Sequence, residues 1–162
     1  MVILVDNREQ NFLEFRHPYV ETQEFCTLSV GDYACRFKDG HVPKIHFERK
    51  SIPDLFATLT TNIVRFKDEI KRSHSQGIQL IIIIEGTISD IFEGHEYTKT
   101  EGLSILRTLL TLEEKYKVSH VFCENRIEMQ FYIVEKFCAY QRNRLRAKNV
   151  PQLCSPTGEA KT

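Results

Sequence analysis

Three side chains in the first third of the sequence have types and spacing that suit phosphodiester hydrolysis. Glu48 and Lys50 are two residues apart, so on a strand they project from the same face. Asp32 precedes the neighbouring strand of an expected hairpin, which can bring its carboxylate beside Glu48. Two carboxylates at a strand end form a hard oxygen site suited to Mg²⁺ or Mn²⁺, which can activate water and polarise a phosphoryl oxygen. A lysine one pleat away can orient that water or offset charge growing on the phosphate.

Each of these residues also has an ordinary structural explanation. A Glu-x-Lys pair on a strand is more often an exposed ion pair than a catalytic site. Asp32 lies in a Gly-Asp-Tyr turn, where aspartate is a common turn residue. Spacing alone therefore favours the structural explanation, and only a longer pattern can reverse that balance.

The strands that would position these residues show as apolar runs between turn signals. A continuous β-branched run ends in Asp6, which is typical of a buried strand with polar residues at its carboxyl end. Gly31 and Asp32 form the expected turn between two shorter strands, and the Asp-Gly pair at 39–40 indicates a hairpin. The expected strands cover residues 2–5, 25–30, 33–37 and 44–50.

After residue 50 the apolar period changes to that of a helix. Apolar residues recur every three or four positions over residues 52–70, which predicts one long amphipathic helix. Ser51 and Asp54 resemble a capping pair, and Pro53 suits a first helical turn. Gly77 is expected to close this helix.

The second half of the chain alternates strands with helices. The expected elements are a buried strand at 80–84, a helix with Leu103, Leu106, Leu110 and Tyr116 on one face, a buried strand at 118–122, and a last helix with Ile127, Phe131, Val134 and Cys138 on one face. This order predicts an α/β layered sheet that begins with a meander and ends in crossover units.

Composition limits the class of protein. The 162 residues, 41% hydrophobic and 27% charged, suffice for one folded domain. Lys plus Arg and Asp plus Glu both number 22, which excludes a polycation but allows a local basic surface. The longest apolar run, residues 80–84, is too short to cross a bilayer, so no membrane partner is expected. Asp6 comes too early for a signal peptide.

Cysteines and the carboxyl-terminal composition complete the organisation. Five scattered cysteines without a C-x-x-C pair indicate reduced thiols in an intracellular protein, cytoplasmic or nuclear. Residues 1–140 are expected to form the folded domain, and residues 141–162 a basic, flexible tail. The polar segment 94–100 is a candidate loop over the substrate.

A longer pattern surrounds the three chemically useful residues. Its segments are Val5-Asp6-Asn7-Arg8-Glu9, Gly31-Asp32-Tyr33 and Glu48-Arg49-Lys50-Ser51-Ile52-Pro53-Asp54, followed by Arg65-Phe66-Lys67 and Ile81-Ile82-Ile83-Ile84-Glu85-Gly86. The pattern resembles the nuclease domain of the XPF family, which includes archaeal Hef, with its signature V-D-x-R-E, G-D and E-R-K-x-x-x-D. Every signature position is present without substitution, and the resemblance covers roughly residues 1–140.

The resemblance implies a fold and a set of site residues. The fold would be a single PD-(D/E)XK domain, a restriction-endonuclease-like α/β fold with a mixed central sheet flanked by helices. Asp32, Glu48 and the backbone carbonyl of Arg49 would bind the metal, Asp6 would help to bind it, and Lys50 would be the catalytic lysine. Arg8, Glu9, Arg49 and Asp54 would complete the catalytic signature, with charge neutralisation, phosphate contact and support of the ligands all open as roles.

Several of these residues keep a second explanation. Asp54 can simply cap a helix, and Arg49, which alternates away from Lys50, can pair with Glu9 or Asp54 instead of DNA. Single residues with weaker links to the site have the following alternatives: Arg65 can be a phosphate contact or a solvated position, His46 a site neighbour or a structural histidine, and Glu85 a pocket residue or part of a solvated turn.

The resemblance also predicts activity and partners. We expect a Mg²⁺- or Mn²⁺-dependent endonuclease acting on branched, forked or flap DNA. The alternatives are a non-catalytic DNA-binding and dimerisation subunit, or a related nuclease of restriction or recombination. Relatives commonly add a helicase domain or helix-hairpin-helix motifs, and neither pattern is present here. A homodimer or heterodimer through the late helices is expected, with Leu109, Phe131 and Phe137 as apolar contacts.

Overall fold

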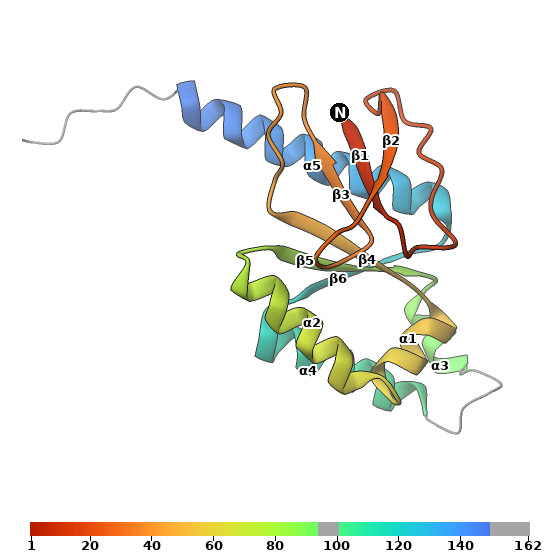
Figure 1. Cartoon of the computed structure of the whole chain (residues 1–162). Coiled ribbons are helices and arrows are strands. Elements are labelled where there is room, and N and C mark those ends of the chain that lie inside the picture. Colours follow the sequence, from red (N-terminus) through yellow and green to blue (C-terminus); the bar gives the residue numbers. More distant parts are fainter. Residues whose placement is uncertain (94–100, 150–162) are drawn as a thin grey trace, which may run out of the picture.

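The apolar runs become strands of one mixed sheet in the computed structural model, which describes residues 1–93 and 101–149 (Figure 1). The strands are β1 (Val2–Asp6), β2 (Thr22–Cys26), β3 (Tyr33–Arg36), β4 (Ile45–Ser51), β5 (Gln79–Glu85) and β6 (Ser119–Cys123). The helices are α1 (Ile52–Leu59), α2 (Ile63–Ser75), α3 (Ile88–Glu93), α4 (Gly102–Tyr116) and α5 (Arg126–Asn149). Helices cover both faces of the sheet, so the expected α/β fold with a mixed central sheet is confirmed.

The strand order is β2-β1-β3-β4-β5-β6. Strands β1, β3 and β4 pair antiparallel, and β4, β5 and β6 pair parallel through helical crossovers. The expected opening meander is wrong at its second strand, because β2 pairs parallel with β1 at the sheet's outer edge. This strand covers residues 22–26 rather than 25–30, because the backbone of Leu28 bonds to side chains instead of a strand: its N–H donates to Asp6 and its carbonyl accepts from Arg8.

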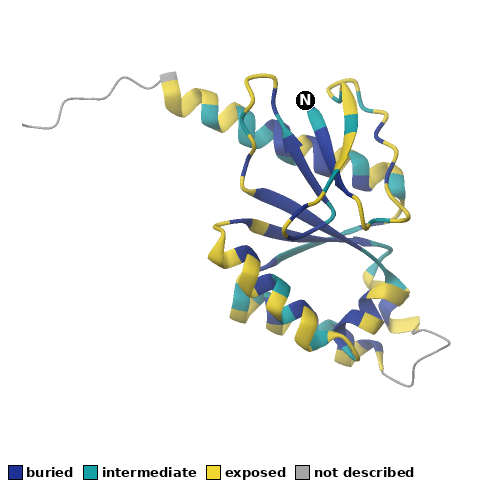
Figure 2. Ribbon diagram, viewed as in Figure 1, coloured by how far each residue is buried: buried dark blue, intermediate teal, exposed yellow. Residues whose placement is uncertain are grey.

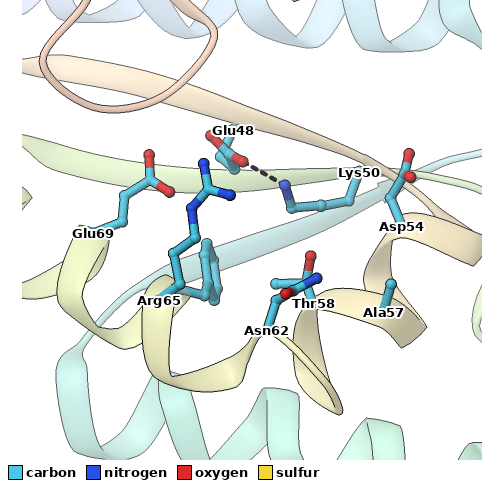
Figure 3. A pocket seen from close by; sticks show the side chains of 9 residues that line it. Glu48, Lys50, Asp54, Ala57, Thr58, Asn62, Arg65 and Glu69 are labelled. Carbon is cyan, nitrogen blue, oxygen red and sulfur yellow. Dashed lines mark hydrogen bonds and ion pairs between the residues drawn. The ribbon is translucent and has the colours of Figure 1, made fainter.

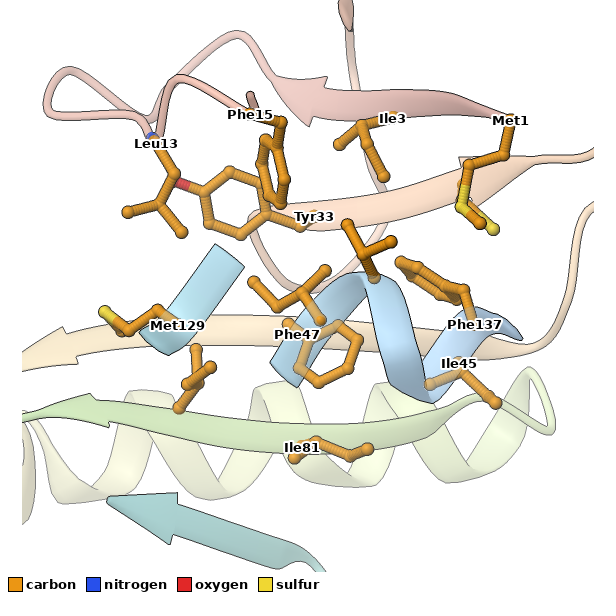
Figure 4. Close-up of a cluster of buried hydrophobic side chains, with 14 of the residues drawn as sticks. Met1, Ile3, Leu13, Phe15, Tyr33, Ile45, Phe47, Ile81, Met129 and Phe137 are labelled. Carbon is orange, nitrogen blue, oxygen red and sulfur yellow. The ribbon is translucent and has the colours of Figure 1, made fainter. Parts of the chain in front are cut away.

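Two apolar layers hold the helices to the sheet (Figure 2). Strand β5 contributes to both, because Ile81 and Ile83 pack toward α5 while Ile82 and Ile84 pack toward α1, α2 and α4. Figure 4 shows the α5 side, where Phe137 meets Phe47 of β4 with ring centroids 5.4 Å apart. Burial on both faces explains why β5 reads as an unbroken apolar run.

The single long helix expected over residues 52–70 is wrong. Helix α1 ends at Leu59, and Thr60 leaves the helical conformation at φ −110°, ψ −82°. The Thr60 hydroxyl donates to the Phe56 carbonyl at 2.7 Å, and the Asn62 N–H donates to the Ala57 carbonyl. A Thr-Thr-Asn run competes for backbone hydrogen bonds and breaks a helix whose apolar period continues across it.

The buried face of α4 differs from the expected one. Leu103 and Leu110 are 41% and 45% exposed, whereas Ile105, Leu109 and Leu112 form the buried stripe. The expected face and the buried stripe both have helical spacing, so only the packing of α4 against α1 and α3 decides between them. Leu109 is therefore a core residue and cannot supply the dimer contact expected of it.

Helix α5 departs from expectation at its face and at its end. Phe137 is fully buried in the core, which removes it from the expected dimer surface, while Ile127 and Phe131 are exposed. The helix runs on to Asn149, so residues 141–149 are helical rather than a flexible tail. The expected loop 94–100 and the remainder of the expected tail, residues 150–162, lie outside the described residues.

Strand β6 lies at the sheet edge and is only half-buried, not the fully buried strand expected over residues 118–122. Strand β6 has a neighbouring strand on one side only, so its side chains are partly exposed to solvent. Within the described residues, no helix combines the length and apolarity required to span a membrane.

Candidate active site

A tight turn before β3 brings Asp32 to the edge of β4. Gly31 adopts φ +72°, and a Cβ atom there would lie 2.9 Å from the Phe47 carbonyl oxygen. Only glycine combines this conformation with so close an approach. The Asp32 N–H then donates to the Phe47 carbonyl at 2.7 Å, and the Arg49 N–H donates to Asp32 Oδ2 at 2.8 Å.

Glu48 and Lys50 project from the same face of β4, as their spacing predicts. Lys50 Nζ donates to Glu48 Oε1 (Figure 3), and the two side chains are only 16% and 9% exposed. The Lys50 ammonium also lies 5.8 Å from the centroid of the Phe66 ring on α2. The pair is therefore a buried one, unlike the exposed ion pair that a Glu-x-Lys strand usually forms.

The two carboxyl groups compete for one ammonium. Burial, together with the nearby Glu48, raises the pKa of Asp32 to about 8. Burial also raises the pKa of Glu48. Burial alone would lower the pKa of Lys50, but the attraction of Glu48 outweighs it, so that the Lys50 pKa is raised. A further cation at this point would allow both carboxylates to ionise.

Asp6, the last residue of β1, is in a very different state. Its two oxygens accept four hydrogen bonds, three from Arg8 and one from the Leu28 N–H, at 2.6–2.9 Å. Burial alone would raise the pKa of Asp6, but these donors outweigh it and hold the pKa below its ordinary value. The Asp6 N–H donates to the Asp32 carbonyl at 2.8 Å, so the two residues are neighbours. The oxygens of Asp6 thus already have hydrogen-bond donors. Metal binding by Asp6 stays a prediction.

The donors at this edge fit a hard divalent cation. Asp32 Oδ1 accepts no hydrogen bond from the described residues, and Glu48 has Lys50 alone. In the part of the chain that the structure describes, no three Asp, Glu, His or Cys side chains cluster as a metal site. Mg²⁺ commonly takes one or two carboxylates and completes its shell with water, which this pair allows.

The carboxylates open into a cleft walled by α2. A hollow of about 260 Å³ contains Lys50 and Asp54, and one of about 800 Å³ contains Asp6, Arg8 and Asp32. Both hollows are lined by the same four residues: Glu48, Asn62, Arg65 and Glu69. Figure 3 shows the Arg65 side chain extending from α2 toward Glu48. The exposed Arg65 is thus at the cleft, where it can meet a phosphate.

Glu69 is a site residue that the sequence analysis missed. Its Oε1 accepts the Gly31 N–H at 3.1 Å, which fastens α2 to the turn that carries Asp32. Its negative charge also acts on Glu48 and Lys50. The signal that could have found it is its position four residues after Arg65, on the same helix face.

Arg49 has a different partner from those expected. Its guanidinium pairs with Glu85 at the end of β5, not with Glu9 or Asp54. Its Nε is buried and has no hydrogen-bond partner among the described residues. Glu85 is accordingly tied to β4 rather than standing in a solvated turn.

Three further candidates fall around this centre. Ser51 caps α1 by accepting the Asp54 N–H at 3.3 Å, and its hydroxyl donates to the Asp54 carboxylate at 2.6 Å. Asp54 also lines the smaller hollow. Glu9 lines the larger hollow, and its carboxylate accepts the Asn11 N–H at 2.7 Å. His46 is buried with Nδ1 at 2.8 Å from the Val30 carbonyl, and burial lowers its pKa, which fits a structural role.

Comparison with known proteins places this geometry in context. The family model described as the ERCC4 domain matches residues 5–136. The solved structure of XPF from Aeropyrum pernix superimposes with a TM-score of 0.62 at 19% identity, over 91% of this chain and 68% of that one. The structure of XPF from Aeropyrum pernix in complex with DNA superimposes with a TM-score of 0.60 at 20% identity, over 96% of this chain and 68% of that one. No curated protein matches the sequence.

Proposed function

Because this chain belongs to the ERCC4 domain family, we propose that it is a metal-dependent DNA endonuclease. The observation that carries the proposal is the pairing of a half-buried carboxyl group, Asp32, with a buried one, Glu48, beside the Lys50 ammonium in an open cleft. A binding-only domain has no use for two acids that burial keeps from ionising together. The family relationship supplies DNA as the substrate.

Asp32, Glu48 and the Arg49 carbonyl would hold Mg²⁺ or Mn²⁺. The ion would lower the pKa of a bound water and polarise the scissile phosphate. Lys50, already donating to Glu48, is placed to orient the attacking water and to offset the charge growing on phosphate oxygens. Arg65 on α2 and Arg8 at the end of β1 stand at the rim, where guanidinium groups can bind flanking phosphates.

The proposed substrate is branched, forked or flap DNA. The test incubates the chain with labelled flap, fork, junction and linear duplexes of one sequence, in Mg²⁺, in Mn²⁺ and in chelator. We expect cleavage that needs metal and is lost in Lys50→Ala, while the exposed Lys38→Ala, 80% exposed at its side chain, cleaves normally. Binding without cleavage in every metal would favour a non-catalytic subunit, and equal cleavage of linear duplex would favour a restriction-type nuclease.

The proposal includes pairing with a second copy or a related chain. Of the three contacts expected for it, Leu109 and Phe137 are fully buried, and Phe131 is exposed. The exposed Leu103 and Leu110 on α4 are apolar positions that remain available for such a contact. Light scattering on the wild-type chain and on a Leu103→Glu, Leu110→Glu variant measures whether a dimer forms through this face.

A further inference from the structure

The segment that follows β1 lines two hollows, the catalytic cleft and a second groove. Arg8 and Glu9 line the cleft, and Asn11 and Phe12 line a separate groove of about 520 Å³. The opposite wall of the groove is the first part of α5, with Ile127, Gln130 and Phe131. The Asn11 N–H donates to the Glu9 carboxylate at 2.7 Å, so a direct contact joins the lining of the cleft to the lining of the groove.

Aromatic rings stand in this region with their surfaces open to solvent. Phe131 is 52% exposed and meets the His17 ring edge-on at 5.1 Å between centroids. Phe12 is 36% exposed and meets Phe25 edge-on at 5.0 Å. A T-shaped contact fixes the orientation of both rings and covers one face of only one of them. Exposed rings of this kind are the platforms on which nucleic-acid bases stack.

Hydrogen bonds hold the two walls together. The Arg126 guanidinium donates to Asn11 Oδ1 at 3.0 Å, to the Asn11 carbonyl at 2.9 Å and to the Phe12 carbonyl at 2.5 Å. The Arg16 N–H donates to Gln130 Oε1 at 3.3 Å. The groove is thus formed before any ligand arrives, which lowers the cost of ordering on binding.

The charge of the groove suits a phosphate backbone. Its lining holds two arginines, Arg16 and Arg126, against one carboxylate, Glu14. Arg16 pairs with Glu14 at 2.9 Å on the surface, whereas Arg126 has no carboxylate partner among the described residues. A basic groove with aromatic platforms favours a single strand, because the bases of a duplex are already stacked and cannot reach the rings.

We propose that this groove binds an unpaired DNA strand next to the cleavage site, with bases stacked on Phe131 and Phe12. The proposal rests on the proposed function and adds the structural feature that the chain recognises, a single-stranded arm. It assigns to the segment between β1 and β2 a role in selecting the substrate.

The binding test uses a fluorescein-labelled 12-nucleotide oligothymidine in chelator, so that cleavage plays no part. Phe131→Ala and Phe131→Leu should weaken binding roughly fivefold or more, because leucine keeps the apolar contact but cannot stack. Phe131→Trp should keep the affinity. The matched control is Phe92→Ala on α3, because Phe92 is 54% exposed, nearly the same as Phe131. Circular dichroism checks that each variant folds.

Three results would overturn the inference, and the first two concern affinity. They are wild-type affinity in Phe131→Leu and the same loss in Phe92→Ala. The third is a change of oligomeric state in Phe131→Ala by light scattering with no change in affinity, which would make the groove a protein interface.

Cleavage separates this inference from the proposed function. On a flap substrate, Phe131→Ala should raise KM several-fold with kcat unchanged, and its affinity for blunt duplex in chelator should equal that of the wild type. Lys50→Ala should lose cleavage and keep oligothymidine binding. If the wild-type chain cleaves nothing in any metal, the proposed function fails, and the affinities measured in chelator still decide whether the groove binds a single strand.

Discussion

Asp6 and Asp32 are neighbouring carboxyl groups at one edge of the sheet, yet the chain holds them in opposite states. Asp6 accepts four hydrogen bonds and has a lowered pKa, whereas Asp32 accepts one and has a pKa near 8. The first is satisfied by the protein itself. The second is left unsatisfied beside another acid, Glu48, which is the condition that a bound cation would relieve. The contrast separates a carboxylate used for structure from one kept for chemistry.

Among the substitutions that test this contrast, Asp32→Asn has the largest expected effect. We expect hydrolysis to fall about a thousandfold or more, because the amide cannot supply a negative metal ligand. Stability in chelator should not fall, since the change removes an acid that burial disfavours. Single-turnover cleavage and urea unfolding measure the two effects. A large loss of stability with normal cleavage would reverse the assignment.

The second test is the pH dependence of stability in chelator. The Asp32 pKa rises from 3.8 to about 8 on folding, so protonation stabilises the folded state. That contribution is complete below pH 3.8 and is lost as the pH rises through 8. Between about pH 5 and pH 8 we expect the free energy of unfolding to fall by on the order of 3 kcal/mol more in the wild type than in Asp32→Asn.

His46 also contributes to the pH dependence of stability. Its pKa is lowered by burial, so its contribution has the opposite sign and grows as the pH rises toward neutrality. The same histidine is present in both proteins, so it cancels in the difference between them. Identical pH profiles for the wild type and Asp32→Asn would contradict the raised pKa.

The third test is Asp6→Asn, which changes the carboxylate that the protein itself satisfies. The amide cannot accept all the hydrogen bonds from Arg8 and Leu28, and we expect the free energy of unfolding to fall by about 2 kcal/mol. Cleavage per folded molecule should change far less than in Asp32→Asn. Should Asp6→Asn instead retain stability and lose metal affinity, measured by calorimetry with Mn²⁺, Asp6 would be the ligand that the family resemblance implies.

The smallest expected effect concerns Glu69, which joins α2 to the Asp32 turn. Glu69→Gln keeps an acceptor for the Gly31 N–H, and Glu69→Ala removes it. We expect the alanine variant to lose about tenfold in single-turnover rate and the glutamine variant about threefold or less. Lys71→Ala, an exposed α2 position paired with Asp68, serves as the control. Equal losses in the two variants would show that the charge of Glu69 matters and its hydrogen bond to Gly31 does not.

The sequence was sufficient where the information is local. The alternation that puts Glu48 and Lys50 on one face, the apolar run of β5 and the glycine turn before Asp32 all follow from short stretches of chain. The sheet and its two helical layers follow from the order of such stretches. The site could therefore be predicted as three residues, Asp32, Glu48 and Lys50, brought together at one edge.

What could not be predicted depends on packing between distant segments. Arg49 meets Glu85 because β4 and β5 align Ser51 with Glu85, a register that no local pattern states. The buried stripe of α4 was ambiguous because two sets of leucines and isoleucines share the helical period. Glu69 was missed because its partner, Gly31, lies 38 residues away.

The Asp32 turn is fastened on both sides before any ion arrives. Its N–H is bound to Phe47, its carbonyl to the Asp6 N–H, and the adjacent Gly31 N–H to Glu69. An incoming cation would thus find this oxygen donor already immobilised, and little conformational entropy would be lost on capture. Loosening the turn would then show up calorimetrically as a less favourable entropy of metal association, although every coordinating atom is still present.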